Sequence, residues 1–188
     1  MGLRRLRGTA LEPLVREHLP AREDERTAEL CRDFRVARRR GYLTLGELVA
    51  ACRWKSPRPI KHIRANTHHR VRAATRTALT TRSEALRLEA LLQLVGVSVP
   101  TASAILTLLD PKRYGVIDIR VWQLLHAVGA VTENRKGTHF RPEHWLQFLS
   151  ILRHLSSRLG VTVREVELTL FNVHKAHQHG RLYEARGI

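Results

Sequence analysis

Apolar side chains recur at intervals of three and four residues along most of this chain, an interval that places them on one face of an α-helix. The clearest stripe predicts a helix over 142–159, with apolar positions at Trp145, Phe148, Leu149, Leu152, Leu155 and Leu159. A second stripe predicts a helix over 23–40, with Thr27, Leu30, Phe34 and Ala37 on one face. Further helices are predicted over 11–18, 45–53, 67–79, 81–95, 100–109, 119–128 and 162–173. Because no stretch predicts a strand, the expected fold is all-α.

Residues with side-chain oxygens precede several of these helices and are expected to cap their first turns. Capping-box spacing occurs at Thr44 with Glu47, at Thr81 with Glu84 and at Thr162 with Glu165, and Asn66 is expected to cap the helix over 67–79. Between two of the helices, Pro57 and Pro59 exclude regular helical structure. Residues 54–59 are therefore expected to form an exposed connector.

The length of 188 residues suits one domain of ordinary size or two small lobes. We expect a mobile basic arm over residues 1–9, a single helical domain over 10–173 and a polar tail over 174–188. The tail carries His174, His177 and His179, whose spacing only loosely resembles that of metal ligands. No metal site is predicted there.

Net charge narrows the choice of partner. Lys and Arg number 33 against 17 Asp and Glu, so the formal net charge is +16. No acid occurs between Glu47 and Glu84, whereas basic residues accumulate there: Arg53, Lys55, Arg58, Lys61, Arg64, Arg70, Arg72, Arg76 and Arg82. This segment either binds the phosphates of a nucleic acid or forms a solvated basic face. We expect an anionic polymer as the partner.

Other classes of protein are disfavoured. Two cysteines, Cys31 and Cys52, are too few for a four-cysteine zinc or iron–sulfur site. Residues 90–109 carry no charge, but Gly96, Ser98, Pro100 and Thr101 interrupt them, so a broken and buried helix pair is expected rather than a membrane span. The expected protein is a cytoplasmic monomer that does not interact with membranes.

Residues 91–122 carry the most informative pattern. An apolar helix end is followed by a tight break at 96–98, and Pro100 then begins a second apolar helix. Backbone N–H groups at the start of that helix can hold a phosphate. Asp118, the one acid between Asp110 and Glu133, precedes a third apolar helix. As a helix N-cap it needs no further explanation, since Asp is common there.

This stretch resembles the helix-hairpin-helix DNA glycosylase superfamily. The resemblance rests on residues 94–102 (LVGVSVPTA) and 117–122 (IDIRVW), and it is concentrated in 83–128. Asp118 follows Gly96 by 22 residues, a separation typical of the family. The resemblance implies a two-lobed all-α fold and a catalytic role for Asp118. It also implies DNA-backbone contacts at the hairpin residues Gly96, Val97, Ser98, Val99 and Thr101, where members of the family often bind a monovalent cation.

Two departures from the family pattern bear on the chemistry. Pro100 stands where members that also cleave the strand carry a lysine, so the resemblance implies a monofunctional enzyme that leaves an abasic site. Lys112 lies near in sequence, but it is expected to be a solvated loop charge rather than a nucleophile. Ser98 replaces the second hairpin glycine, and its Cβ would hinder a positive φ or a close backbone approach.

Base removal requires an extruded nucleotide, a pocket for its base and a side chain that fills the gap in the duplex. The candidates for pocket or wedge are Trp54, Trp122, Tyr42, Asn66 and His68, with His69 as a further polar reader. Trp54 is the best of these, while Trp122 and Tyr42 have an alternative place in the core. Phosphates flanking the base are expected to contact Arg58, Lys61, Arg64 and Arg70.

The expected function is hydrolysis of an N-glycosidic bond in double-stranded DNA. The excised base could be a damaged one, in repair, or a modified base of phage DNA, in defence. Two alternatives stay open: a non-catalytic helix-hairpin-helix protein that binds DNA, and an RNA-binding or ribosome-associated protein.

Overall fold

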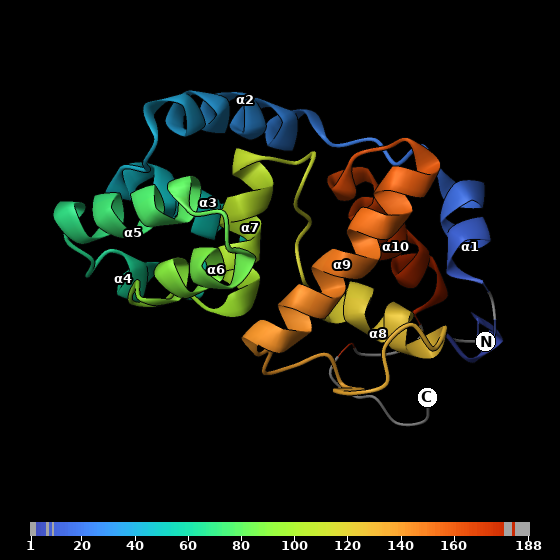
Figure 1. Cartoon of the computed structure of the whole chain (residues 1–188). Helices are drawn as coiled ribbons and strands as arrows, with labels where there is room; N and C mark the ends of the chain where they lie inside the picture. The colour runs from blue at the N-terminus through green and yellow to red at the C-terminus, as the bar shows by residue number, and fades with distance from the viewer. Residues whose placement is uncertain (1–2, 7, 9, 179–181, 183–188) are drawn as a thin grey trace.

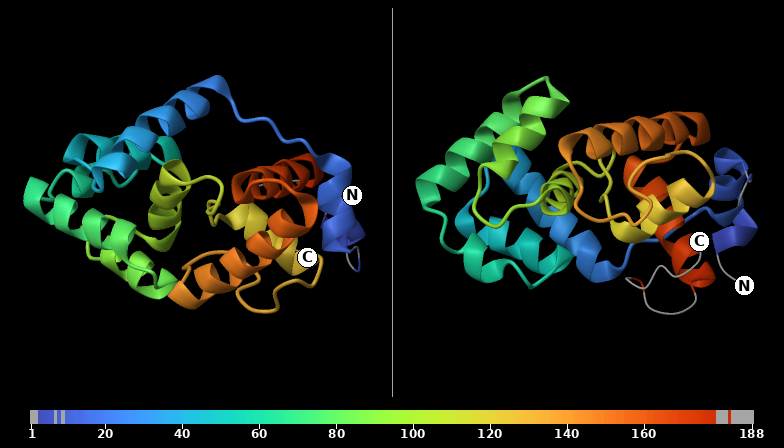
Figure 2. Two further views of the ribbon diagram at one scale, coloured as in Figure 1. Left: turned by 45° about the horizontal axis from the view of Figure 1, so that its top comes forward. Right: turned by 90° about the horizontal axis from the view of Figure 1, so that it is seen from below.

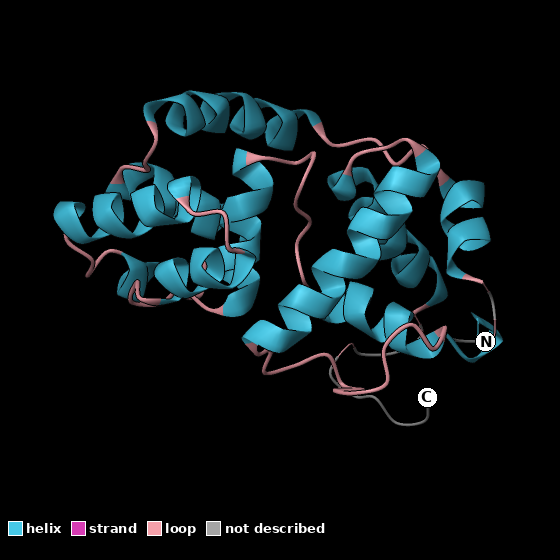
Figure 3. Ribbon diagram, in the orientation of Figure 1, coloured by secondary structure: helices cyan, strands magenta, loops and turns pink. Residues whose placement is uncertain are grey.

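A computed structural model describes residues 3–6, 8, 10–178 and 182, and all regular structure within these ranges is helical, as the sequence predicts (Figure 3). Within this part of the chain, no helix is long and apolar enough to cross a membrane. The helices are η1 (Leu3–Leu6), α1 (Leu11–His18), α2 (Glu25–Arg40), α3 (Leu45–Lys55), α4 (Ile60–Ile63), α5 (His68–Thr80), α6 (Glu84–Leu92), α7 (Val99–Leu109), α8 (Ile119–Ala127), α9 (Pro142–Leu159) and α10 (Val163–His177).

The helices form two groups, α2 to α7 on one side and α1 with α8 to α10 on the other (Figure 1). The chain passes between the groups twice, through residues 19–24 and through residues 110–118 (Figures 1 and 2). Helix α6 packs against α9 and thereby joins the groups. Since the two connecting segments lie between the groups, their side chains can meet others from both.

Helix α7 is the centre of the first group. Every residue from Thr101 to Leu109 is buried, and the helix packs against α2, α3 and α6. The side chains of α7 are therefore surrounded by protein rather than water. This burial accounts for the lack of charge in the α7 part of the run over 90–109, and no membrane is needed to explain it. The expected break between two helices is present, and α7 is buried as expected, whereas α6 is buried on one face only.

Two of the three expected capping boxes are present, at Thr44 with Glu47 and at Thr162 with Glu165. The other predicted caps are wrong by one or two residues. Ser83 caps α6 in place of Thr81, and Thr67 caps α5 in place of Asn66. In both cases neighbouring residues could supply a side-chain oxygen, and the local pattern does not distinguish them.

Three boundary predictions need correction. The segment 1–9 is not simply an arm, because Leu3 and Leu6 are buried and η1 packs against α8. The polar tail begins later than residue 174, because α10 continues to His177 and His174 is buried; His179 lies outside the described residues. The connector begins after Lys55, since α3 includes Trp54 and Lys55, and residues 60–63 form the additional short helix α4.

Candidate functional site

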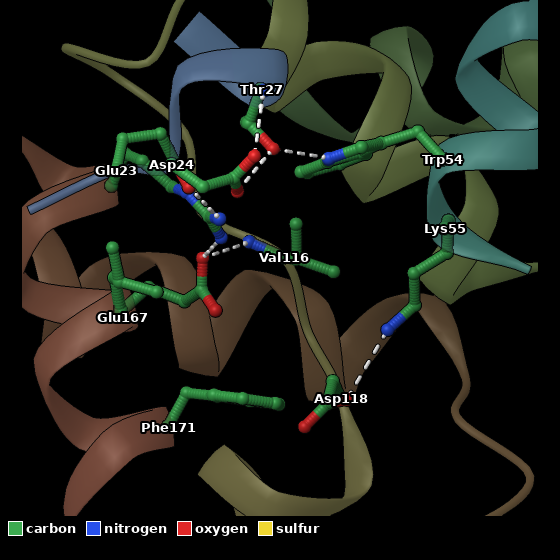
Figure 4. A pocket seen from close by; sticks show the side chains of 11 residues that line it. Glu23, Asp24, Thr27, Trp54, Lys55, Val116, Asp118, Glu167 and Phe171 are labelled. Carbon is green, nitrogen blue, oxygen red and sulfur yellow. Dashed lines mark hydrogen bonds and ion pairs between the residues drawn. The ribbon is translucent and has the colours of Figure 1, made fainter.

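A cavity of about 340 Å³ lies where the two connecting segments pass between the helix groups (Figure 4). The first connecting segment contributes Glu23 and Asp24, and the second contributes Val116 and Asp118. The remaining lining residues come from α2, α3 and α10: Thr27, Trp54, Lys55, Arg164, Glu167, Leu168 and Phe171. This volume falls within the usual range of small-molecule sites. The predicted catalytic aspartate therefore lines a pocket.

Asp118 is held by three hydrogen bonds. As the N-cap of α8, its Oδ1 accepts the backbone N–H of Arg120 at 2.8 Å and that of Val121 at 3.4 Å. Its Oδ2 accepts a hydrogen bond from Lys55 Nζ at 3.2 Å, and the carboxylate stays 15% exposed. Donors on both oxygens fix the orientation of the carboxylate. The side chain is thus an ordered anion at the pocket.

Lys55 is the residue that sequence reasoning missed. It is the last residue of α3, its side chain is 21% exposed, and 63 positions separate it from its partner Asp118. In the sequence it is one of nine basic residues in an acid-free segment, and nothing local distinguishes it. Only the packing of α3 beside the second connecting segment brings the two together.

Trp54 lines the same pocket. Its indole Nε1–H donates to Thr27 Oγ1 at 2.9 Å, and the guanidinium of Arg164 lies 5.4 Å from the ring centre. The ring is therefore fixed as a wall of the cavity, opposite the α10 residue Phe171. Its position suits an aromatic surface for a base, and its role as pocket or wedge stays a prediction.

A partly buried ionic cluster lines the pocket. Arg164 pairs with Glu23 through Nε, at 2.6 Å, and through Nη2, at 3.1 Å, and it also pairs with Glu167. Glu167 accepts the backbone N–H of Val116 at 3.3 Å. Burial raises the pKa of Glu167 above its ordinary value, against the opposing influence of Arg164. These bonds tie α10 to both connecting segments.

Gly115 allows the second connecting segment to lie close to α10. A Cβ at this position would lie 2.9 Å from the Cβ of Glu167 and 3.1 Å from Cδ2 of Leu152. Contacts this short require a shift of the helix or of the segment. The glycine therefore lets residues 115–118 pass close to α10.

The pocket is acidic although the chain as a whole is basic. Four carboxylates line it, those of Glu23, Asp24, Asp118 and Glu167, against the two cations Lys55 and Arg164. A phosphate would be repelled from such a cavity, whereas a neutral or cationic group would not. Any nucleic acid must therefore place its phosphates outside the pocket.

The hairpin between α6 and α7 is fastened by Asn66. The Asn66 amide donates to the carbonyl of Val95 and accepts the Val95 backbone N–H, both at 2.9 Å, and it also donates to the carbonyl of Ile63 at 2.8 Å. Asn66 is buried, so the structure places it as a support of the hairpin and not as a base reader. Arg70 also donates to this turn, at the carbonyl of Gln93.

Ser98 fits its place in the hairpin without strain. Its φ is −98°, in the extended region, so the position does not require glycine. Its side chain makes no capping hydrogen bond to α7, and its Oγ lies 3.1 Å from Thr101 Oγ1. The Ser98 side chain therefore accepts no hydrogen bond from the first-turn N–H groups of α7. The expected steric hindrance from the Ser98 Cβ does not arise, because the backbone here does not need a positive φ.

The other aromatic candidates lie elsewhere. Trp122 is fully buried in the core, where its Nε1–H donates to the carbonyls of Glu133 and Asn134 and its ring packs edge-on against Phe140. Tyr42 lies under the guanidinium groups of Arg40, Arg72 and Arg76. Neither residue lines the pocket with Asp118. Full burial rules Trp122 out as a wedge, whereas Tyr42 is half-buried and its role as a wedge stays a prediction.

The remaining predicted residues are at the surface. His68 and His69 are exposed in the first turn of α5 and do not line the pocket. Arg58, Lys61 and Arg64 are exposed on and beside α4, the helix that follows Lys55. Exposure leaves these three able to contact a polyanion.

Among the described residues, no group of three or more His, Cys, Asp or Glu side chains could hold a metal ion. Searches of protein-family models, curated proteins and solved structures found no match to this chain. The geometry of the pocket, together with the sequence motifs, therefore carries the functional argument.

Proposed function

We propose that the protein is a DNA N-glycosylase that removes a base from duplex DNA and uses Asp118 as its catalytic carboxylate. The observation that carries the proposal is the position of Asp118, an ordered anion on the wall of a 340 Å³ pocket with aromatic side chains. The resemblance of residues 94–102 and 117–122 to the helix-hairpin-helix glycosylases supports the same assignment.

The chemistry needs an anion beside the sugar. As the bond between C1′ and the base nitrogen breaks, its electrons leave with the base and positive charge develops on the deoxyribose. The Asp118 carboxylate stabilises that charge, and it accepts a proton from the water whose oxygen bonds to C1′. Because three hydrogen bonds hold the carboxylate in advance, little reorganisation accompanies the reaction.

The basic surface that follows Lys55 along the chain suits a duplex. Exposed basic residues lie on and after the α3–α4 connection, whereas Val99 and Thr101 at the start of α7 are buried. Phosphates would stay on this basic surface while one extruded base enters the acidic cavity beside Trp54. The base excised, and a role in repair or in phage defence, belong to the same proposal.

The test is incubation with duplexes that carry single modified bases and with modified phage genomic DNA. An abasic-site probe reports base loss, and mass spectrometry identifies the released base. Asp118→Asn keeps an oxygen for the α8 cap, so it should fold normally, bind DNA and lose about 100-fold or more in the rate of base release. Equal base release by Asp118→Asn and the unchanged protein would contradict the proposal.

A second candidate function is non-catalytic DNA binding. The three hydrogen bonds of Asp118 favour it, since capping of α8 and pairing with Lys55 account for this residue without any chemistry. This function predicts no base release from any substrate and an effect of Asp118→Asn on stability alone. The same panel therefore separates the two.

A further inference from the structure

The pocket contains an amine that the hairpin motif does not supply. The chain has 28 arginines and only five lysines, and four of these lysines, Lys61, Lys112, Lys136 and Lys175, are exposed. Lys55 differs from them, because its ammonium group lines the cavity and lies 3.2 Å from Asp118 Oδ2. An arginine could form the same ion pair, but its guanidinium cannot lose a proton and act as a nucleophile.

We infer that Lys55 gives this pocket a second activity, cleavage of the DNA strand at an abasic site through a Schiff base. The inference rests on the proposed function, because it requires the sugar of an extruded nucleotide to reach the pocket. Because Pro100 stands in place of the hairpin lysine, the hairpin has no amine. An amine from another element could still take that role. In this protein, Lys55 at the end of α3 places an amine against the carboxylate of Asp118.

The Lys55–Asp118 contact suits both halves of the reaction. Asp118 Oδ2 takes a proton from the Lys55 ammonium, and the freed lone pair of Nζ attacks the C1′ aldehyde of the opened abasic sugar. The resulting carbinolamine loses its hydroxyl as water, with the proton returned by Asp118, and a C1′=N imine forms. Water is the only by-product of this step.

Strand cleavage follows by β-elimination. The protonated imine acidifies C2′, and the Asp118 carboxylate, ionised again after returning its proton, accepts the proton that leaves C2′. A C2′=C3′ double bond then forms, and the C3′–O bond breaks with its electrons on the phosphate. The products are a 5′-phosphate on the downstream strand and an unsaturated aldehyde on the upstream one. Hydrolysis of the imine then releases Lys55. No oxidant, metal or cofactor enters this sequence.

The pocket also favours the neutral product of base removal. An abasic sugar carries no base and exposes an aldehyde, whereas its phosphates stay on the basic surface outside. Lys55 is the last residue of α3 and the connector follows directly, so the amine lies at the border between these two regions. This is where C1′ of an extruded sugar would lie beside Asp118.

The experiment uses a duplex with one abasic site prepared beforehand, so that base specificity does not enter. The full-length protein is incubated with it in sodium borohydride, which reduces an imine to a stable secondary amine, and adducts are separated on a denaturing gel. A covalent protein–DNA adduct is expected, with mass spectrometry of the digest locating the added mass on Lys55. No adduct, or an adduct on another amine, would overturn the inference.

Lys55→Arg is the decisive variant, because it keeps the positive charge beside Asp118 while lacking the nucleophile. We expect it to retain the melting temperature, to form no adduct and to lose cleavage of abasic DNA. Lys112→Arg, an exposed loop lysine outside the pocket, is the matched control and should form the adduct normally. Adduct formation by Lys55→Arg at the unchanged level would contradict the assignment.

Failure of the Lys55 inference can be distinguished from failure of the proposed glycosylase function. Base release is measured on modified duplexes without borohydride, and abasic cleavage is measured on DNA that has already lost its base. A protein that releases bases but forms no adduct is a glycosylase without the Lys55 activity. A protein that forms the adduct but releases no base from the panel would retain the Lys55 activity and lose the glycosylase proposal.

Discussion

At the scale of single residues, burial changes the acid–base behaviour of groups around the site. His174, on α10, is 1% exposed, and its Nε2 lies 3.1 Å from Gln123 Oε1. Burial lowers the pKa of His174 to about 4, with Arg120 adding to the effect. Because the unfolded chain keeps the ordinary value near 6.5, the unfolded state takes up the proton first as the pH falls.

This difference makes a prediction about pH and stability. The contribution of neutral His174 is complete above about pH 6.5 and is lost as the pH falls towards 4, with a total of up to about 3 kcal/mol. Urea unfolding of the unchanged protein and of His174→Gln at pH 7 and pH 4.5 measures it. The variant should lose less stability between the two pH values, whereas the exposed control His154→Gln should behave like the unchanged protein.

At the scale of elements, the turn between α6 and α7 depends on a glycine for two separate reasons. Gly96 has a φ of +80°, and a Cβ there would lie 2.9 Å from the Cβ of His62 and 3.2 Å from the backbone nitrogen of Ile63. Gly129 has nearly the same φ, +81°, but a Cβ there would meet nothing within 4 Å. A substitution at Gly129 therefore tests backbone strain alone, whereas a substitution at Gly96 tests backbone strain together with a steric clash.

Gly96→Ala and Gly129→Ala should therefore differ in their cost. Both substitutions place an alanine at positive φ, at a cost of about 1 kcal/mol each. Gly96→Ala must also displace α4 or the hairpin, which adds about 1–3 kcal/mol. Comparison of the two free energies of unfolding isolates the steric part. Equal losses would show that the close approach of the hairpin to α4 is unimportant.

At the scale of the whole molecule, a cluster of hydrogen bonds around Glu84 joins the two groups of helices. This α6 carboxylate accepts hydrogen bonds from Arg153 of α9 at 2.8 Å, from Arg113 at 3.1 Å and from the Tyr114 hydroxyl at 3.1 Å. Burial alone would raise the pKa of Glu84, but Arg153 and its other partners outweigh this and lower it. The cluster therefore fastens α6 to α9 and to the second connecting segment.

Glu84→Gln should consequently reduce stability by about 1–3 kcal/mol, because it removes a charge and leaves partly buried cations. The depressed pKa of Glu84 means that its contribution is present near neutral pH and is lost as the pH falls through the folded-state value. Chemical denaturation of this variant and of the control Glu89→Gln, an exposed glutamate on the same helix, measures the difference. A loss of stability that is equal in the two variants would argue against the cluster.

The charge of the whole molecule predicts how binding responds to salt. With a net charge of +16, affinity for a random duplex should fall by about a thousandfold between 50 and 200 mM salt. Each of Arg58→Ala, Lys61→Ala and Arg64→Ala should lower the slope of log affinity against log salt by about one. Fluorescence anisotropy on a labelled duplex measures both quantities. An unchanged slope in all three variants would place the duplex on another surface.

Local pattern was sufficient for most of the secondary structure. The period of apolar residues predicts nine helices, and each corresponds to a helix of the structure with ends that agree to within about four residues. Gly41 and Gly160 end α2 and α9 in the left-handed conformation. Asp118 is recognisable as a cap from its position before an apolar run. These features depend on interactions within about four residues, which is the range that a sequence pattern describes.

The composition of the pocket depends instead on contacts between distant segments. Periodicity tells which side of a helix is buried, but it does not tell which residues lie against that side. Trp122 therefore lies in the core, Asn66 supports a hairpin 29 residues away, and Lys55 pairs with a carboxylate 63 residues away. The helices, the net charge and the capping boxes at Thr44 and Thr162 follow from the amino-acid sequence. The meeting of Lys55, Trp54 and Asp118 follows from how two groups of helices pack, because only packing brings residues from remote turns within hydrogen-bonding distance.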